Sequence, residues 1–438
     1  MTSWRERHSE PHIEWGGARG DLAGERPVAA QSAPAQRLTL RQWSGLVATN
    51  VGASVAFSAM YATQPILPQV GQAFHVDAAT AGLTLLAVTF GLAFSSLAAG
   101  RIIDHFGSRR VMIICSLLLL ALSVAAALAP TFGLLVAIRA GQGLVVPGIT
   151  VAGLAFLHNE LPASWRGRVS GFYIGTNTIG GLIGRLTVGL SVETLSWRGG
   201  LGLDAILVAA GTAILIVGMP RESLHIGAAD PASTREGVPL LTILARLWWA
   251  PLIGAAVFFP FLTVFTYTPY RLESAPFYLT PSTANLFYLV YLLGAVASAL
   301  AGQISDRFGR RLTIYGGLLI CGVGLTLSLL NFLPAALAAL GLVCVGSLSA
   351  HVVANASVSD GANPLGARAR ATALSLYTLG FYMGGGLGAF IPGFGWEHFG
   401  WIGVVVPCGV AVVGAGLVAL KTPRRAQRAT AVLSPSIP

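Results

Sequence analysis

The sequence predicts an all-α polytopic membrane protein whose twelve transmembrane helices form two pseudo-symmetric bundles of six. Composition is the first reason, because 54% of the 438 residues are hydrophobic and only 10% are charged. The second reason is that apolar runs of about 20 residues, the length needed to cross a bilayer, recur between short polar breaks. The third reason is that the second half of the chain repeats motifs of the first half.

Twelve apolar runs define the expected spans. In lipid a single segment satisfies its own backbone groups only as a helix, so a helix is expected for each run. The spans are residues 42–66, 80–100, 111–129, 132–157, 169–190, 199–219, 248–270, 282–302, 312–330, 334–357, 371–391 and 400–420. The first bundle is therefore expected over residues 42–219 and the second over 248–420, with a cytoplasmic linker at 220–247.

The positive charges indicate the orientation of the helices. With a cytoplasmic N-terminus, 23 of the 27 Lys and Arg residues fall in tails and cytoplasmic loops, and only Arg198 and Arg271 fall on the opposite side. This pattern follows the positive-inside rule and predicts a multi-pass protein of the inner membrane with both termini in the cytoplasm. Residues 1–41 lack a signal-peptide pattern and are expected to be a disordered tail, and residues 421–438 form a second tail. The net charge of +10 then reflects topology, and no nucleic-acid partner is expected.

No cofactor or metal is expected. Each of the four cysteines stands alone in an apolar run, where cysteine behaves as a small hydrophobic residue. The chain has no phosphate-binding loop that would indicate ATP as the energy source, and its eight histidines lack metal-ligand spacing. These observations argue against an enzyme.

Motifs of the first half recur in the second. A shift of 202 residues places Gly100, Asp104, Gly107 and Arg109 on Gly302, Asp306, Gly309 and Arg311. A shift of 204 residues places Arg166 on Arg370, Tyr173 on Tyr377 and Gly184 on Gly388. Both sets fall at equivalent spans, so the two bundles are predicted to be a parallel duplication.

At these positions the chain resembles the major facilitator superfamily. The superfamily signature, Gly-x-x-x-Asp-x-x-Gly-[Arg]-[Arg/Lys], occurs here between helices 2 and 3 and again between helices 8 and 9. Ser108 departs from the usual arginine in the first copy, whereas Arg310 keeps it in the second. The resemblance implies the major facilitator fold and a transporter that works by alternating access.

The two signature carboxylates are expected to act as conformational latches. A tight turn at a cytoplasmic surface explains the glycines and arginines of the signature, but it does not explain a carboxylate at a helix end. In the fold that the resemblance implies, helix 2 approaches helix 11 and helix 8 approaches helix 5. We expect Asp104 to hold the positive start of helix 11, and Asp306 that of helix 5, when the cytoplasmic face closes. The partner arginines are Arg368 or Arg370 and Arg166 or Arg168, respectively.

Ionisable residues inside spans are costly and suggest function. Arg139 with Gln142 matches Arg-x-x-Gln-Gly, the helix 4 motif of proton-coupled antiporters in the superfamily, and the resemblance implies a role in proton coupling. The alternative is a structural arginine that binds backbone carbonyls of a neighbouring helix. Both interpretations stay open at this stage.

Three further intramembrane residues are candidates for proton coupling. Arg185 and Asp204 lie at similar depth on consecutive helices, where they could form a neutral buried pair. Helices 1 and 4 lack the carboxylate that antiporters normally carry. This leaves Asp204 as the carboxylate candidate, or coupling by Glu160 and Asp360 at the cytoplasmic helix ends, or no proton coupling at all. His351 titrates near neutral pH and is a second candidate.

A substrate cavity is expected between the bundles. Asn50, Ser54, Phe57 and Tyr61 recur at helical spacing in helix 1, which lines the cavity in the facilitator fold. The other cavity candidates are Asn177, Phe261, Phe265, Tyr267, Asn355 and Tyr377.

Short stretches such as YATQPILPQV and TPYRLESAP resemble the YnfM-type inner-membrane transporters of the drug:proton antiporter branch. This resemblance implies a secondary transporter in the lipid bilayer that exports small-molecule drugs or metabolites in exchange for protons. We expect it to be monomeric. A solute uptake symporter, a facilitated uniporter and a transport-dead sensor are the alternatives.

Overall fold

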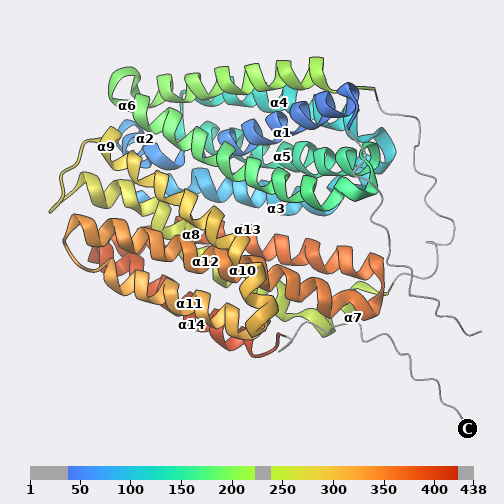
Figure 1. Ribbon diagram of the computed structural model, residues 1–438. Coiled ribbons are helices and arrows are strands. Elements are labelled where there is room, and N and C mark those ends of the chain that lie inside the picture. The colour runs from blue at the N-terminus through green and yellow to red at the C-terminus, as the bar shows by residue number, and fades with distance from the viewer. Residues whose placement is uncertain (1–37, 222–237, 423–438) are drawn as a thin grey trace, which may run out of the picture. The chain divides into compact units, whose positions relative to one another are not determined.

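The structure, a computed structural model, describes residues 38–221 and 238–422, and these residues form helices and no strands (Figure 1). Ten of the helices have the length and composition to cross a membrane. One of them, α6 (Arg166–Gly218), is two helices, because the backbone turns at Ser196 with φ of 61°. With α11 (Arg310–Leu327), which opens with two arginines, the described residues contain the twelve predicted spans.

Each half contains six long helices. The first half consists of α1 (Leu40–Tyr61), α3 (Ala78–Phe106), α4 (Ser108–Ala127), α5 (Phe132–Glu160) and the two parts of α6, with η1 (Gln64–Ile66) and α2 (Leu67–Phe74) after α1 and η2 (Ala163–Trp165) before α6. The second half consists of α8 (Trp249–Glu273), α10 (Tyr291–Phe308), α11, α12 (Leu333–Ala362), α13 (Ala367–Phe399) and α14 (Trp401–Ala419), with α9 (Pro281–Asn285) and η4 (Leu286–Val290) before α10 and η5 (Asn363–Leu365) before α13.

Several helices extend beyond their apolar runs. The helix predicted to end at residue 391 continues to Phe399, and the break predicted at 191–198 is confined to the turn at Ser196. An apolar run marks the thickness of the lipid core, whereas a helix continues for as long as its backbone bonds are satisfied. The predicted linker 220–247 contains α7 (Leu240–Leu247), which packs on α12 and α13. Most of that linker, and of both predicted tails, lies outside the described residues, at 222–237, 1–37 and 423–438.

The duplication is visible in how α1 packs on α6 and α8 packs on α13. A Cβ atom added to Gly184 of α6 would lie 2.4 Å from the Ser58 carbonyl oxygen of α1. A Cβ atom added to Gly388, its counterpart in α13, would lie 2.7 Å from the Phe259 carbonyl oxygen of α8. Small residues allow such backbone contact between membrane helices, so the repeated glycines hold equivalent helix pairs together.

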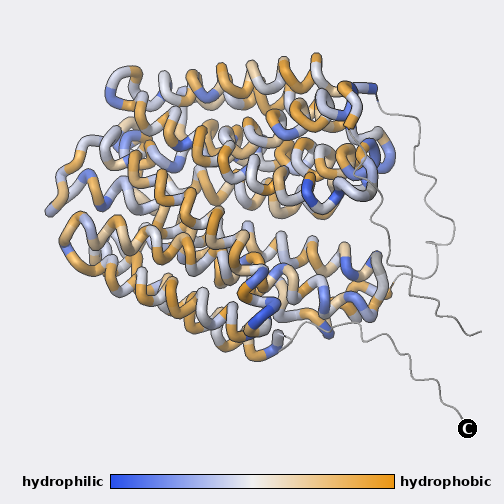
Figure 2. Tube along the Cα trace, in the orientation of Figure 1, coloured by the Kyte–Doolittle hydropathy of each residue, from blue (hydrophilic) through white to orange (hydrophobic). Residues whose placement is uncertain are grey.

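The helices present apolar side chains outward. Val410, Val413 and Leu417 of α14 are each at least 65% exposed, which suits a surface in contact with lipid chains and not with water. Figure 2 shows hydrophobic residues along the lengths of the helices, with many of the most hydrophilic residues near their ends. This distribution agrees with a multi-pass membrane protein.

The two halves are joined at one end. There, the start of α3 crosses α13 so closely that a Cβ atom on Gly82 would lie 2.1 Å from the Ala389 carbonyl oxygen. We call this end, where α2 and α9 lie, the closed end, and the opposite end, which carries Asp104 and Asp306, the signature end. Figure 1 shows the ribbons of the two halves diverging from the closed end toward the signature end.

Candidate transport site between the two halves

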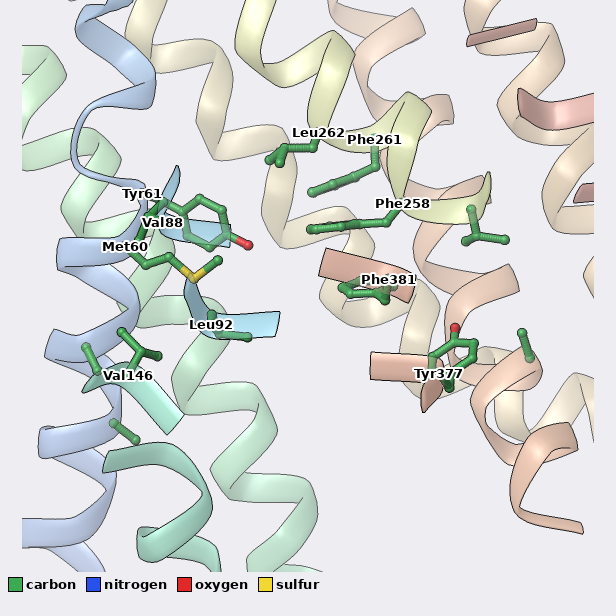
Figure 3. Close-up of a cluster of buried hydrophobic side chains, with 14 of the residues drawn as sticks. Met60, Tyr61, Val88, Leu92, Val146, Phe258, Phe261, Leu262, Tyr377 and Phe381 are labelled. Carbon is green, nitrogen blue, oxygen red and sulfur yellow. The ribbon is translucent and has the colours of Figure 1, made fainter. Parts of the chain in front are cut away.

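An aromatic cluster lies where the two halves face each other. Its members are Phe57 and Tyr61 of α1, Phe258, Phe261 and Phe265 of α8, Tyr288 of η4, Tyr291 of α10, and Tyr377, Phe381 and Tyr382 of α13. Phe258 stacks on Phe381 with ring centroids 3.8 Å apart. Figure 3 shows Tyr61 with its hydroxyl directed toward the side on which Phe258 and Phe261 lie. Aromatic faces of this kind suit a flat apolar solute.

The predicted cavity residues do not all belong to this cluster. Phe57, Tyr61, Phe261, Phe265 and Tyr377 do. Tyr267, by contrast, lies in a separate buried cluster near the closed end, with Ala78 and Val404, and its hydroxyl donates to the Ala389 carbonyl at 2.8 Å.

The polar residues of the predicted stripe on α1 bind within the first half. The Asn50 amide donates to the Leu46 carbonyl at 2.7 Å, and the Ser54 hydroxyl donates to the Thr176 carbonyl of α6 at 3.1 Å. Asn177 and Asn50 each retain a buried amide oxygen without a hydrogen-bond partner among the described residues.

His351 is held by Tyr377. His351 Nδ1 lies 2.9 Å from the Tyr377 hydroxyl, which also donates to the His351 carbonyl at 3.1 Å. The imidazole lies 4.1 Å from the Phe381 ring, centroid to centroid. His351 and the half-buried Asn355, on the same face of α12, therefore lie beside the aromatic cluster.

Arg139 is buried and fully engaged by the first half. Its Nη1 donates to the Ala59 carbonyl at 2.7 Å and to Gln142 Oε1 at 2.6 Å, its Nη2 donates to the Met60 carbonyl, and its Nε donates to the Thr84 carbonyl at 3.4 Å. Ala59 and Met60 belong to the last turn of α1, where carbonyls lack the regular helical N–H partners, although the Ala59 carbonyl also accepts a long bond of 3.4 Å from the Ala62 N–H. This geometry is that of the structural interpretation, in which the arginine caps a neighbouring helix.

Asp204 is bound to α1 and not to Arg185. Its carboxylate accepts a hydrogen bond of 2.5 Å from the Ser58 hydroxyl, and no described cation lies within ion-pair distance of it. The expected Arg185–Asp204 pair is therefore wrong. Similar depth is not sufficient for pairing. The two residues lie on different helices of α6, on either side of the turn at Ser196, and Asp204 contacts Ser58 of α1 whereas Arg185 binds Gln64 and Gly181.

Arg185 lies between the halves. Its Nε donates to Gln64 Oε1 at 2.7 Å and its Nη1 to the Gly181 carbonyl at 2.9 Å. Its guanidinium carbon lies 3.9 Å from the ring centroid of Tyr61, and 5.1 and 5.6 Å from those of Tyr291 and Tyr288 in the second half.

Polar contacts cross between the halves at the closed end. Gln64 Nε2 donates to the Thr266 hydroxyl of α8 at 2.9 Å, and Gln69 donates to Glu273 at 2.8 Å. The Ala78 N–H at the start of α3 donates to Glu397 of α13 at 3.0 Å. Further contacts connect α6 with α9, where the Ser282 N–H donates to Glu193 at 2.8 Å. Together these bonds seal the closed end.

At the signature end, the residues expected to form the latches are not paired. Asp104 and Asp306 are exposed, as are the four arginines expected to pair with them, and no ion pair joins any of these six residues. In the conformation described here the expected latches are therefore not engaged. This agrees with their expected dependence on conformational state and does not test it.

The signature arginines bind within their own halves. Arg109 donates to the Met219 carbonyl after α6 at 3.1 Å, and the equivalent Arg311 donates to the Thr422 carbonyl after α14 at 2.8 Å. Arg310, expected to belong to the latch set, pairs instead with Asp360 at 2.5 Å. Gly107 and Gly309 make the tight turns with φ of 82° and 92°.

Sequence reasoning missed several residues of the interface. Gln64 bridges the halves, Tyr288 and Tyr291 face Arg185, and Glu273 accepts the bond from Gln69. A carboxylate so near the end of the apolar run in α8 was a usable signal for Glu273. Nothing in the sequence distinguished the two tyrosines from those that face lipid.

Comparisons with known proteins agree with this architecture. A family model described as Major Facilitator Superfamily matches residues 49–275 and 272–435. The inner membrane transport protein YnfM of Escherichia coli (strain K12) is 30% identical over 397 residues, covering 89% of this chain and 91% of that protein. The uncharacterized MFS-type transporter YybF of Bacillus subtilis (strain 168) is 28% identical over 351 residues, covering 80% and 86%.

Among solved structures, the chain is similar to a bacterial homologue of the human lysosomal transporter Spinster, crystallised in an inward-facing and occupied conformation. The TM-score is 0.71 at 15% identity, and the match covers 88% of this chain and 97% of that one, so the likeness is one of fold. The twelve spans of the described residues, the repeated signature of the sequence and these matches together establish that the chain is a multi-pass membrane transporter and belongs to the major facilitator superfamily.

Proposed function

We propose that the protein exports small organic solutes across the inner membrane by alternating access, in exchange for protons. The observation that supports this most directly is the asymmetry of the interface. Hydrogen bonds between the halves seal the closed end, whereas at the signature end Asp104, Asp306 and the four arginines expected to pair with them are exposed and form no ion pair with one another. A binding region reached from one end alone is what alternating access requires.

The orientation of this asymmetry follows from the charge distribution. The signature end carries the arginine-rich loops, which the positive-inside rule assigns to the cytoplasm. The conformation is then inward-facing, with both termini cytoplasmic, and the aromatic cluster is approached from the cytoplasm. That direction of approach suits collection of a substrate for export.

Asp204 is the proposed proton carrier. It is 2% exposed, and its partner is the Ser58 hydroxyl and not a cation within ion-pair distance in the described residues. A buried carboxylate without an ion pair can exist as a neutral acid, and a hydroxyl can either donate to it or accept from it. Its protonation would alter the contact between α1 and α6. His351, beside the aromatic cluster, is the second candidate.

Reconstitution in liposomes with an imposed pH gradient tests the proposal. Candidate drugs, sugars and amino acids are screened for flux, and we expect at least one to move against an opposing proton gradient. Asp204→Asn should abolish the dependence on the gradient, whereas His351→Ala should abolish it if the histidine carries the proton. Asp77→Asn is the matched carboxylate control, because Asp77 is exposed at the start of α3 and its replacement should leave coupling unchanged. Flux that ignores the gradient in the wild type would refute exchange and favour a facilitated uniporter.

A further inference from the structure

Arg185 is a buried cation whose hydrogen bonds are incomplete. The side chain is 0% exposed, its Nε and Nη1 each have one protein acceptor, and its Nη2 is buried without a hydrogen-bond partner among the described residues. No described carboxylate lies within ion-pair distance of it. A buried charge left in this state is costly, by several kcal/mol in general, and calls for an explanation.

Arg139 provides the comparison within the same half. It is as deeply buried, at 1% exposure, yet each of its three nitrogens donates to a carbonyl or an amide oxygen of the protein. The first half is therefore able to provide at least one acceptor for each nitrogen of a buried guanidinium. Arg185 differs because it lies at the interface, where its Nη2 has no such acceptor among the described residues.

The rings around Arg185 stabilise its charge, and none of them gives Nη2 a hydrogen-bond partner. Tyr61 comes from the first half, and Tyr288 and Tyr291 from the second, so the guanidinium is enclosed by aromatic faces on both sides of the interface. Cation–π contacts contribute up to about 2 kcal/mol when desolvated. These contacts do not provide a hydrogen-bond acceptor for Nη2, which must come from another group, such as a bound ligand.

We propose that Arg185 is an anion-binding residue of the transport site, and that the substrates are organic carboxylates with an aromatic or similarly flat apolar group. A guanidinium binds a carboxylate through two parallel N–H bonds, and the surrounding rings bind the apolar part by stacking. This inference rests on the proposed function and adds the substrate class to it.

The same residue connects binding to the closed end. Gln64 accepts from Arg185 through Oε1 and donates through Nε2 to Thr266 in the second half. A carboxylate that engages Arg185 competes with Gln64 Oε1 and so weakens the Arg185–Gln64–Thr266 bridge. Substrate binding thereby loosens one of the contacts that seal the closed end, as a transport cycle requires.

The test is calorimetric titration of the purified full-length protein in detergent at pH 7 with 1-naphthoate and with 1-naphthamide, its neutral isostere. We expect naphthoate to bind about tenfold or more tightly than naphthamide, in line with a charged hydrogen bond in a buried site. Arg185→Gln should remove this preference, and Arg185→Lys should keep part of it.

Arg271→Gln is the matched control. Arg271 is also a buried arginine against aromatic rings, Trp401 and Phe277, but it lies away from Arg185 and should not affect the preference. Equal affinity of the wild type for the two probes would overturn the inference, and this result does not depend on whether a variant folds. A preference that survives in Arg185→Gln would overturn it as well.

The two proposals fail in different ways. Naphthoate binding that depends on Arg185, together with flux that ignores a pH gradient, would refute proton exchange and support the anion site. Gradient-driven flux of neutral or cationic solutes, with no preference for naphthoate over naphthamide in the titration, would support the proposed function and overturn the anion site.

Discussion

Gly184 of α6 provides a sharp test of how the first half is packed. The Cβ atom of an alanine at this position would lie 2.4 Å from the Ser58 carbonyl oxygen and 2.7 Å from the Ser58 hydroxyl oxygen. Ordinary contact begins at 3.4 Å, so in Gly184→Ala α1 and α6 must separate by roughly 1 Å. Overpacking of this kind costs about 1–3 kcal/mol.

The displacement has a second cost, because Ser58 also donates to Asp204 at 2.5 Å. Moving α1 stretches that bond, and a hydrogen bond to a charged group contributes about 1.5–3 kcal/mol. The overpacking and the partial or complete loss of this bond together give an expected destabilisation of about 2–6 kcal/mol. At about 2–4 °C per kcal/mol for a unit the size of one half, the melting temperature should fall by roughly 4 °C or more.

The assay is thermal unfolding of the purified protein in detergent, followed by tryptophan fluorescence. Gly175→Ala is the control on the same helix, since a Cβ atom there meets nothing within 4 Å and alanine favours a helix by about 1 kcal/mol over glycine. Its melting temperature should stay the same or rise. If Gly184→Ala and Gly175→Ala have the same melting temperature, the close approach of α1 and α6 is wrong.

Three more predictions follow from the helix ends. Asp77→Ala should destabilise α3 by about 1 kcal/mol, because Asp77 caps that helix. Hydrogen bonds from the hydroxyl and N–H of Thr80 lower the pKa of Asp77 in the folded protein. The stabilisation by Asp77 is therefore present at neutral pH and is lost as the pH falls below the ordinary pKa of 3.8 toward the lower pKa of the folded state. The melting temperatures of the wild type and Asp77→Ala should converge in acid, and a constant difference between them would contradict the cap. Arg310→Gln should lower the free energy of unfolding by about 1 kcal/mol, because its ion pair with Asp360, which is 27% exposed, is partly screened by solvent. A double-mutant cycle with Asp360→Asn should show a coupling energy between the two residues, and strictly additive effects would exclude the ion pair. Asp104→Asn should make engineered cysteines more accessible from the signature end, because it removes a latch that holds the conformation in which that end is closed. If transport and the ratio of cysteine accessibility from the two ends are both unchanged, the latch is refuted.

The sequence predicted the architecture well because the bilayer imposes it locally. The number of spans depends on runs of about 20 apolar residues, and each run can be recognised without knowing its neighbours. The duplication was equally predictable from the sequence, since Gly184 and Gly388 recur at a fixed offset. The two glycines make equivalent helix contacts in the structure. Helix ends such as Phe399 were harder to predict, because hydropathy indicates the extent of the lipid core and not the residue at which backbone hydrogen bonding ends.

The partners of the buried polar residues were decided by tertiary structure alone. Asp204 binds Ser58 at a separation of 146 residues, and Arg185 binds Gln64 at a separation of 121, although Arg185 and Asp204 were the pair suggested by their depth. Depth follows from position along a helix, whereas the direction of a side chain depends on the rotation of that helix against its neighbours. The sequence by itself thus determined the fold, the repeat and the burial of Arg139, Arg185 and Asp204, but not that of Arg271. Only tertiary packing decided that every nitrogen of Arg139 finds an acceptor while Arg185 keeps an unused donor at the interface, because hydrogen bonding is set by distances of a few ångströms between segments far apart in the chain.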